Sequence, residues 1–250
     1  MTTVVRAFAP DLFSGKTVLV SGGTSGIGLG TAISFRELGA TVVATGATED
    51  ECERASGEAA NGGIRFVTLD VRNGELVNAT VAALERIDVV VNAAGVIRRD
   101  AEHDPTIFAD VIDINLTGSM RICAGAKEKL AATGGAVVNV ASMLTFFGGP
   151  RVPAYSASKG GIGQLTKSLA AAWAADGIRV NAVAPGWIAT ALTQALQDDP
   201  ELSGPILSRT PMGRWGTSEE VAGGIVFLAS PAARFITGAI LNIDGGYLTS

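Results

Sequence analysis

Seven short runs of consecutive apolar, mostly β-branched residues are spread along the chain. Their apolar positions do not alternate with polar ones, which is typical of parallel strands that are covered on both faces of a sheet. The strands predicted in this way cover residues 16–21, 41–45, 64–69, 87–92, 135–141, 178–184 and 239–243.

Stretches of helical character separate these runs, and no linker rich in proline or serine divides the chain. The regular alternation of strand and helix predicts one α/β domain over residues 1–250. We expect a Rossmann-type doubly wound parallel sheet of about seven strands with helices on both faces. The predicted helices cover residues 27–38, 49–60, 74–85, 106–132, 153–175 and 218–229.

One segment, residues 186–214, departs from this alternation. It holds Pro200, Pro205 and Pro211, a polar stretch around residue 199 and only a weak helical pattern over residues 191–197. The segment follows the sixth strand, at the edge of the sheet where open α/β folds bind their ligands. We therefore expect a mobile substrate lid at about residues 186–214.

The composition narrows the class of protein. Of the 250 residues, 47% are hydrophobic and 17% are charged, which argues against a disordered chain. The net charge of −5 and the absence of a basic run argue against a nucleic-acid partner. No run of 18 apolar residues predicts a membrane span, and the first 13 residues lack the apolar core of a signal peptide.

The two cysteines are isolated and the chain has a single histidine, His103, so we predict no metal site. This cysteine usage is typical of a reducing compartment, and we expect a cytoplasmic protein.

A glycine-rich loop, Gly22-Gly23-Thr24-Ser25-Gly26-Ile27-Gly28, follows the first predicted strand and opens the first predicted helix. Glycines let the backbone turn tightly and let a phosphate approach the main chain. The helix start offers unpaired N–H groups to an anion. The spacing differs from the usual G-x-G-x-x-G, and the loop is also compatible with an ordinary turn. Its place in a βαβ unit favours a dinucleotide site.

Tyr155 and Lys159 lie one helical turn apart at the start of the fifth predicted helix, residues 153–175. A neighbouring ammonium favours the phenolate, so we expect Lys159 to lower the pKa of Tyr155 and make it a general acid or base. Ser142 ends the fifth predicted strand, where its hydroxyl could reach the same cleft and hydrogen-bond a substrate oxygen. Taken alone, a tyrosine and a lysine at this spacing are usually two surface neighbours on a helix.

Several of these motifs occur together in one order. Asn92-Ala93-Ala94-Gly95 follows the fourth strand, Asn115 lies in the next helix, and Pro185-Gly186 with Thr190 follows the sixth strand. With the glycine loop, Ser142 and the Tyr155–Lys159 pair, this set resembles the short-chain dehydrogenase/reductase family over nearly all of residues 10–250. Ala93 is a departure, because the family often has a second asparagine there.

The resemblance implies an enzyme that interconverts a secondary alcohol and a ketone by hydride transfer with NAD or NADP, and it implies a homotetramer. Tyr155 would be the acid or base, Lys159 would hold the nicotinamide ribose, Ser142 would orient the carbonyl, and Asn115 would hold a relay water. The implied cofactor residues are Gly22, Thr24, Ser25, Gly26, Ile27, Gly28, Gly46, Ala47, Asp70, Val71, Asn92, Ala93, Gly95, Tyr155, Lys159, Pro185, Gly186, Ile188 and Thr190.

The choice between the two cofactors depends on the end of the second strand, where an acid binds the ribose 2′-hydroxyl or an arginine accepts a 2′-phosphate. Gly46 and Ala47 occupy these positions, and Ser25 stands where many NADP enzymes of the family carry a basic residue. Because no cation is present to neutralise a 2′-phosphate, we lean toward NAD and leave NADP open.

Segments 95–100, 141–144, 148–155 and 213–216 resemble the branch of the family that acts on sugar acids, the 2-deoxy-D-gluconate 3-dehydrogenases and gluconate 5-dehydrogenases. A guanidinium is a natural clamp for a carboxylate, and Arg98, Arg99 and Arg151 flank the predicted cleft. We therefore expect a sugar acid such as 2-deoxygluconate or gluconate as the small-molecule substrate. The expected substrate-binding residues are Arg99, Ser142, Leu144, Arg151 and Trp187.

Three alternatives remain open at this point. The low charge of segment 186–214 is also compatible with a 3-oxoacyl-thioester reductase or with a reductase of a hydrophobic or cyclic ketone. A dinucleotide-binding sensor without turnover is a third, although a sensor does not need Ser142, Tyr155 and Lys159 together.

Overall fold

The computed structural model describes residues 5–249. Residue 250 lies outside the described part, and so do residues 1–4 of the N-terminal segment in which no signal peptide is predicted. The described part contains a seven-stranded sheet in the order β3-β2-β1-β4-β5-β6-β7, and every neighbouring pair is parallel. This confirms the predicted doubly wound α/β fold. The strands are β1 (Thr17–Ser21), β2 (Thr41–Gly46), β3 (Ile64–Thr68), β4 (Val89–Asn92), β5 (Ala136–Val140), β6 (Arg179–Pro185) and β7 (Ile240–Ile243).

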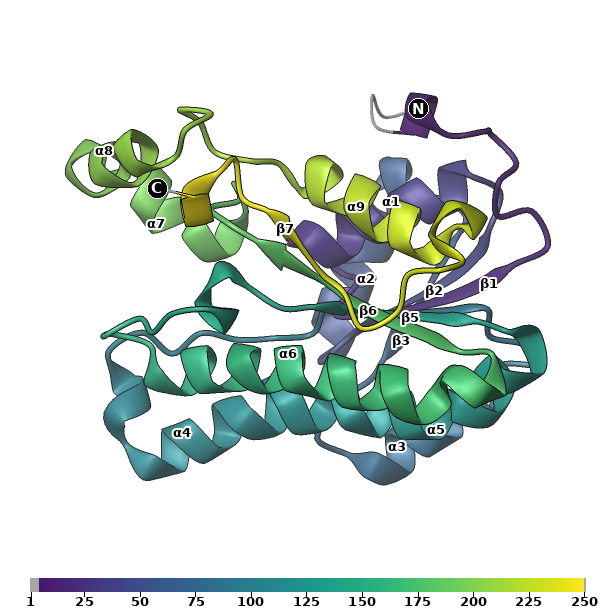
Figure 1. Ribbon diagram of the computed structural model, residues 1–250. Coiled ribbons are helices and arrows are strands. Elements are labelled where there is room, and N and C mark those ends of the chain that lie inside the picture. The colour runs from purple at the N-terminus through teal and green to yellow at the C-terminus, as the bar shows by residue number, and fades with distance from the viewer. Residues whose placement is uncertain (1–4, 250) are drawn as a thin grey trace.

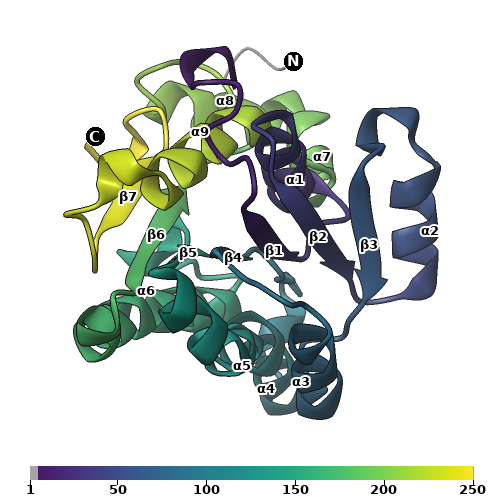
Figure 2. The same cartoon turned by 90° about the vertical axis from the view of Figure 1, so that its right-hand side faces the viewer.

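Helices cover both faces of the sheet, with α1 and α9 on one face, α3 to α6 on the other, and α2 beside the edge strand β3 (Figures 1 and 2). Each face of the sheet carries its own hydrophobic core, and successive strand residues point into opposite cores. Val18 packs toward α1 and α9, whereas Leu19 packs toward α3 and α5. The helices are α1 (Gly26–Glu37), α2 (Glu49–Gly57), α3 (Gly74–Ala82), α4 (Pro105–Ile112), α5 (Gly118–Thr133), α6 (Pro153–Trp173), α7 (Gln194–Gln197), α8 (Pro200–Arg209) and α9 (Ser218–Ala229).

The long helix predicted over residues 106–132 is interrupted in the structure. A five-residue π-helical turn, Asp113–Thr117, separates α4 from α5. The pattern of hydrophobic residues reports only the average helical repeat. A single wider turn inside a continuous helix therefore cannot be recognised from it. The turn is relevant to function because it contains Asn115.

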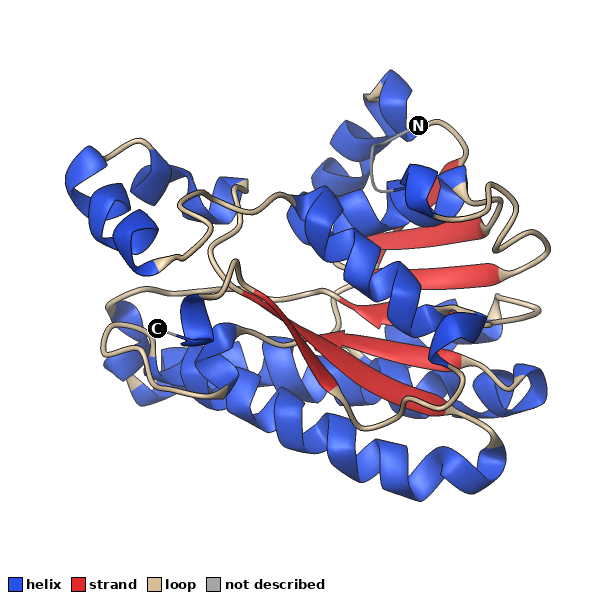
Figure 3. Ribbon diagram, turned by 45° about the horizontal axis from the view of Figure 1, so that its top comes forward, coloured by secondary structure: helices blue, strands red, loops and turns tan. Residues whose placement is uncertain are grey.

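The segment predicted to be a weakly helical lid contains two helices, α7 and α8, which lie together beyond the carboxyl ends of the strands (Figure 3). The prediction missed α8 because Pro205 lies inside it, and an internal proline removes one backbone hydrogen bond of a helix. Asp199 compensates at the start of the helix, where its side chain accepts a hydrogen bond from the Glu201 amide at 2.9 Å. Pro200 occupies the first helical turn, which tolerates proline.

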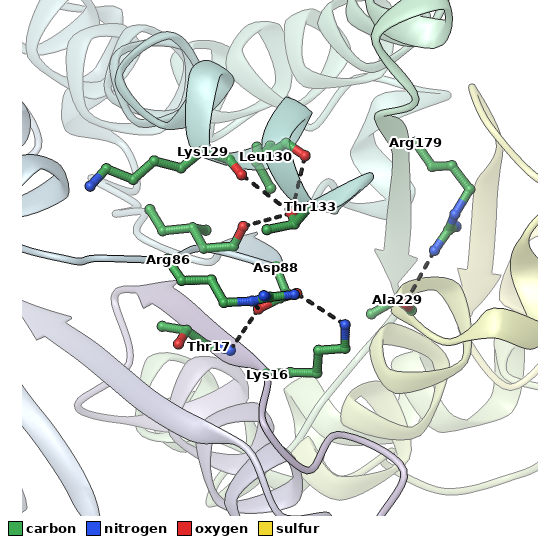
Figure 4. A network of polar contacts seen from close by, with 10 residues as sticks. Lys16, Thr17, Arg86, Asp88, Lys129, Leu130, Thr133, Arg179 and Ala229 are labelled. Atoms are coloured by element: carbon green, nitrogen blue, oxygen red, sulfur yellow. Dashed lines mark hydrogen bonds and ion pairs between the residues drawn. The ribbon is translucent and has the colours of Figure 1, made fainter.

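A cluster of charged side chains joins the strands at their amino ends (Figure 4). The buried carboxylate of Asp88 accepts hydrogen bonds from the Thr17 amide at 3.0 Å, from Lys16 at 3.2 Å and from Arg86 at 2.6 Å. These donors hold the pKa of Asp88 below its usual range, although burial opposes them. The cluster ties β1 to the start of β4.

The strand order places β1 beside β4, and the chain leaves this pair toward opposite edges of the sheet. A crevice therefore opens at the carboxyl ends of these strands, which is where doubly wound sheets bind ligands. None of the helices within residues 5–249 is both long and apolar enough to cross a membrane. The same residues bring no group of three or more potential metal-ligating His, Cys, Asp or Glu side chains together.

Candidate active site

Two cavities lie at the carboxyl ends of the strands, and Tyr155 lines both of them. The larger, about 840 Å³, extends from residues after β2 and β3, past the glycine loop, to Tyr155 and Lys159. The smaller, about 540 Å³, is enclosed by the loops after β5 and β6 and by α7 and α8. The arrangement provides two separate binding spaces with one titratable side chain between them.

The glycine loop forms the floor of the larger cavity and has the features of a phosphate-binding turn. Gly22 has a φ of +66°, and a Cβ at Gly28 would lie only 2.1 Å from the carbonyl oxygen of Gly22. Ser25 is the N-cap of α1, but its side chain makes no capping hydrogen bond. The first amides of a 12-residue helix thus face the cavity without a side-chain cap, which fits a pyrophosphate group.

Tyr155 and Lys159 lie on the same face of α6. The Lys159 ammonium is 5.5 Å from the centre of the Tyr155 ring, and it donates a 2.6 Å hydrogen bond to the carbonyl oxygen of Val140 at the end of β5. Burial lowers the pKa of Lys159 to about 8. The Lys159 side chain is therefore charged at neutral pH and loses its proton in slightly alkaline solution.

The expectation that Lys159 lowers the pKa of Tyr155 is wrong for this structure. Burial raises the pKa of Tyr155 to about 12, the nearby Glu102 carboxylate adds to the rise, and a hydrogen bond with the Ser142 side chain opposes it. The sequence revealed the neighbouring cation but not the loss of solvent around the phenol, which has the larger effect. Tyr155 is consequently protonated at neutral pH and available as a proton donor.

Ser142 lies at the start of a short 3-10 turn, Met143–Thr145, that leaves β5. Its hydroxyl accepts a hydrogen bond from the Leu144 amide at 3.2 Å, while the Thr145 hydroxyl accepts one from the Ser142 amide at 3.3 Å. The reciprocal pair fixes the turn. It also holds the Ser142 hydroxyl beside Tyr155, at the wall of the smaller cavity.

Asn115 is buried in the π-helical turn, and its side chain lines neither cavity. Its Oδ1 accepts a hydrogen bond from the Val96 amide at 2.8 Å, and its Nδ2 donates to the Val96 carbonyl at 3.0 Å and to Ser158 Oγ at 3.1 Å. The side chain therefore joins the loop after β4 to α6 and supports the helix that carries Tyr155. The relay water predicted from the resemblance stays a prediction.

Fourteen of the nineteen predicted cofactor residues line the larger cavity, and five do not. Gly46 is buried at the end of β2, and the Asn92 side chain points into the core, where it donates to Asn139 Oδ1 at 2.8 Å and to Cys123 Sγ at 3.2 Å. Pro185, Gly186 and Ile188 line the smaller cavity instead. The larger cavity is lined by Gly22, Thr24, Ser25, Gly26, Ile27, Gly28, Ala47, Asp70, Val71, Ala93, Gly95, Tyr155, Lys159 and Thr190.

The structure brings the five predicted substrate residues together around the smaller cavity, namely Arg99, Ser142, Leu144, Arg151 and Trp187. Arg151 is paired with Asp100, with Nε 2.6 Å from a carboxylate oxygen, whereas Arg98 lines the larger cavity. The sequence reading missed Arg209 of α8, which also lines the smaller cavity and stacks on Tyr247, 4.3 Å from the ring centre. The unrecognised α8 explains this omission.

Glu102 is a second residue that the sequence did not reveal. Its side chain is fully buried, and its two carboxylate oxygens accept hydrogen bonds of 2.8 Å from the Arg98 amide and from the Tyr155 amide. The carboxylate therefore fastens the start of α6 to the loop after β4. Polar residues surround it in the sequence, so no local signal marks it as buried.

Comparison with known proteins gives consistent matches over nearly the whole chain. Residues 22–248 match the family described as enoyl-(acyl carrier protein) reductase. The chain is 40% identical to the 2-dehydro-3-deoxy-D-gluconate 5-dehydrogenase of Bacillus subtilis, covering 96% of this chain and 98% of that protein. It is also 40% identical to the cis-4-hydroxycyclohexanecarboxylate dehydrogenase of Sinomonas cyclohexanicum, covering 95% and 98%.

Among solved structures, the chain is similar to an Agrobacterium tumefaciens protein described as a 2-deoxy-D-gluconate 3-dehydrogenase. The two are 39% identical with a TM-score of 0.87, and the match covers 97% of this chain and all of that one. That protein was crystallised with bound NADP. The comparisons thus support a nicotinamide cofactor, but they give no support to the lean toward NAD.

Proposed function

The chain belongs to the short-chain dehydrogenase/reductase family, and we propose that its substrate is a small hydroxycarboxylic acid. The enzyme would interconvert a secondary alcohol group of this acid and the corresponding ketone. Like its relatives, the protein is an NAD(P)-dependent oxidoreductase that interconverts an alcohol and a ketone. The observation that supports a hydroxycarboxylic acid as its substrate is the smaller cavity. It joins the Ser142–Tyr155 pair to a mainly apolar chamber that carries guanidinium groups.

The residues at the junction of the two cavities would move and hold the proton. The bound nicotinamide would supply or accept the hydride. Tyr155, protonated at neutral pH, would donate its proton to the ketone oxygen, and the Ser142 hydroxyl would hydrogen-bond that same oxygen. Lys159 would hold the nicotinamide ribose with the ammonium that β5 already positions through Val140.

Arg99 is the side chain that we assign to the substrate carboxylate. It lines the smaller cavity, and the structure gives it no hydrogen bond or ion pair within residues 5–249, whereas Arg151 is already paired with Asp100. A guanidinium binds a carboxylate through two parallel hydrogen bonds. The indole N–H of Trp187, buried in the same wall and without a partner in the described residues, is a donor for a further substrate oxygen.

A sugar acid, such as gluconate, 2-deoxygluconate or their keto derivatives, is the first candidate because several relatives are named for such substrates. An alicyclic hydroxy acid is the second candidate, favoured by a specific observation. Much of the cavity wall is apolar, with Leu144, Phe147, Leu196 and Ile206 among its residues. A carbocyclic ring would fill this space without leaving hydroxyl groups unpaired.

A coupled assay that follows NAD(P)H tests the proposal. We expect turnover of gluconate, 2-deoxygluconate, 2-dehydro-3-deoxygluconate or cis-4-hydroxycyclohexanecarboxylate, and at least a hundredfold lower kcat/KM for cyclohexanol, which lacks the carboxylate. Faster reduction of a 3-oxoacyl thioester than of any keto acid would contradict the proposal and favour an acyl-thioester reductase. Tight NAD(P)H binding without turnover of any substrate would favour a sensor.

We further propose a homotetramer, as the resemblance implies, with α5 and α6 in one interface. Gly160 on α6 has open space around its Cβ position, and Met120 on α5 is partly exposed. Light scattering after size exclusion tests it, and a monomer at micromolar concentration would exclude it. The expected cytoplasmic location is supported by two cysteines that are both free and buried.

A further inference from the structure

The larger cavity has one end at Tyr155 and another beside the start of α2. At the second end it is lined by Glu51, Arg54 and Ala55 of α2, and by residues after β2 and β3. Figure 2 shows α2 standing beside β3, at the edge of the sheet. Because the pyrophosphate fits the glycine loop between the two ends, the adenosine half of a dinucleotide belongs at the α2 end.

A carboxylate at the end of β2 is the usual group that receives the adenosine ribose, but position 46 is a glycine, and a side chain there would force its neighbours to shift. A Cβ built there would lie 2.7 Å from Thr24 Cγ2, 3.1 Å from Cys52 Sγ and 3.1 Å from Glu51 Oε2. The Glu51 carboxylate therefore already stands beside the point from which a side chain at position 46 would project.

Two hydrogen bonds fix Glu51 in this place. Its Oε2 accepts from the Ala47 amide at 2.8 Å, and its own amide donates to the Thr48 hydroxyl, the N-cap of α2, at 3.3 Å. The first bond turns the side chain back toward the loop after β2. The carboxylate thereby lines the cavity at a defined position.

We propose that Glu51 sets the selectivity between NAD and NADP, in place of the missing acid at position 46. Its carboxylate accepts a hydrogen bond from the ribose 2′-hydroxyl of NAD and repels the 2′-phosphate of NADP. Two like charges within a few ångströms of each other repel strongly at a partly buried site. Arg54 lies one turn further along the same helix and lines the same cavity end, so neutralising Glu51 leaves a cation at this end without its neighbouring carboxylate.

The test is a direct binding measurement on the substrate-free protein, with NADH and NADPH titrated separately and followed by nucleotide fluorescence. The variant is Glu51→Gln, whose amide oxygen can still accept from the Ala47 amide. Glu53→Gln is the matched control, because Glu53 lies on the same helix, is exposed and does not line the cavity. Thermal unfolding of both variants checks that the fold is kept.

We expect Glu51→Gln to lower the ratio of the NADPH Kd to the NADH Kd at least tenfold, while Glu53→Gln changes it less than twofold. An unchanged ratio in folded Glu51→Gln would overturn the proposal, and so would an equal change in both variants. The inference rests on the dinucleotide site but not on the proposed substrate or on Tyr155. A failed substrate screen therefore leaves this measurement meaningful.

Discussion

Replacing Glu102 by glutamine removes a buried carboxylate next to Tyr155 while keeping the size of the side chain. In the native protein both oxygens accept backbone N–H groups, one from Arg98 and one from Tyr155. The glutamine NH₂ group must face one of these donors, so one bond is lost and one buried N–H is left unpaired.

The magnitude follows from these two contacts. A hydrogen bond to a charged group contributes about 1.5–3 kcal/mol, and an unpaired buried N–H costs about 1–3 kcal/mol. Relief from burying a charge offsets part of the sum, so we expect a loss of about 2–4 kcal/mol in the free energy of unfolding. Because Glu102 raises the pKa of Tyr155, the variant should also move the rise of alcohol oxidation with pH to lower pH.

Urea unfolding at a fixed protein concentration measures the first effect, and the pH profile of kcat/KM for alcohol oxidation measures the second. Asp104→Asn is the matched control, since this exposed N-cap of α4 accepts from the Thr106 amide at 2.7 Å and asparagine caps equally well. The control should lose under about 1 kcal/mol with no shift in the profile. A Glu102→Gln protein that matched the control in both measurements would show that the Glu102 carboxylate neither stabilises the fold nor affects Tyr155.

Two further changes test the cofactor floor and the buried lysine. Gly28→Ala places a Cβ 2.1 Å from the Gly22 carbonyl oxygen and should weaken NAD(P)H binding at least tenfold. Gly74→Ala is the control, because the space around Gly74 is open, and it should leave the affinity unchanged. Equal affinities of the two variants would argue against the glycine loop as the phosphate site. For Lys159, whose pKa is lowered to about 8, the folded protein releases its proton before the unfolded chain does, so stability rises with pH above 8. Between pH 7.5 and 9.5 the free energy of unfolding of the native protein should therefore rise by about 2 kcal/mol more than that of Lys159→Met. If the free energies of unfolding of the two proteins changed with pH in the same way, the lowered pKa of Lys159 would be contradicted.

The sheet and its covering helices could be predicted because their signal is local. Continuous apolar runs mark each strand, and turns rich in glycine mark where the strands end. The glycine loop, Ser142, Tyr155 and Lys159 could be located for the same reason, since each follows a recognisable strand or lies one helical turn from its neighbour. The structure brings Ser142, Tyr155 and Lys159 to the junction of the two cavities and places the glycine loop along the larger one.

The errors concern groups whose environment is created by distant parts of the chain. Asn92 ends β4 at the expected place, yet its side chain donates a hydrogen bond to Asn139 on the neighbouring strand β5. Glu102 and Glu51 look like ordinary surface acids in the sequence, but one is buried against α6 and the other lines a cavity. The pKa of Tyr155 depends on desolvation by many residues, which a neighbouring lysine in the sequence does not indicate.

We propose that Tyr155 transfers the proton at the junction of the two cavities, and Tyr155→Phe is the variant that tests this role. We expect it to bind NAD(P)H within about threefold of the native Kd and to lose at least a hundredfold in kcat, the typical contribution of a general acid. Tyr247→Phe, the control at the chain's other tyrosine, should keep kcat within a few-fold. A Tyr155→Phe enzyme with native kcat would contradict the account.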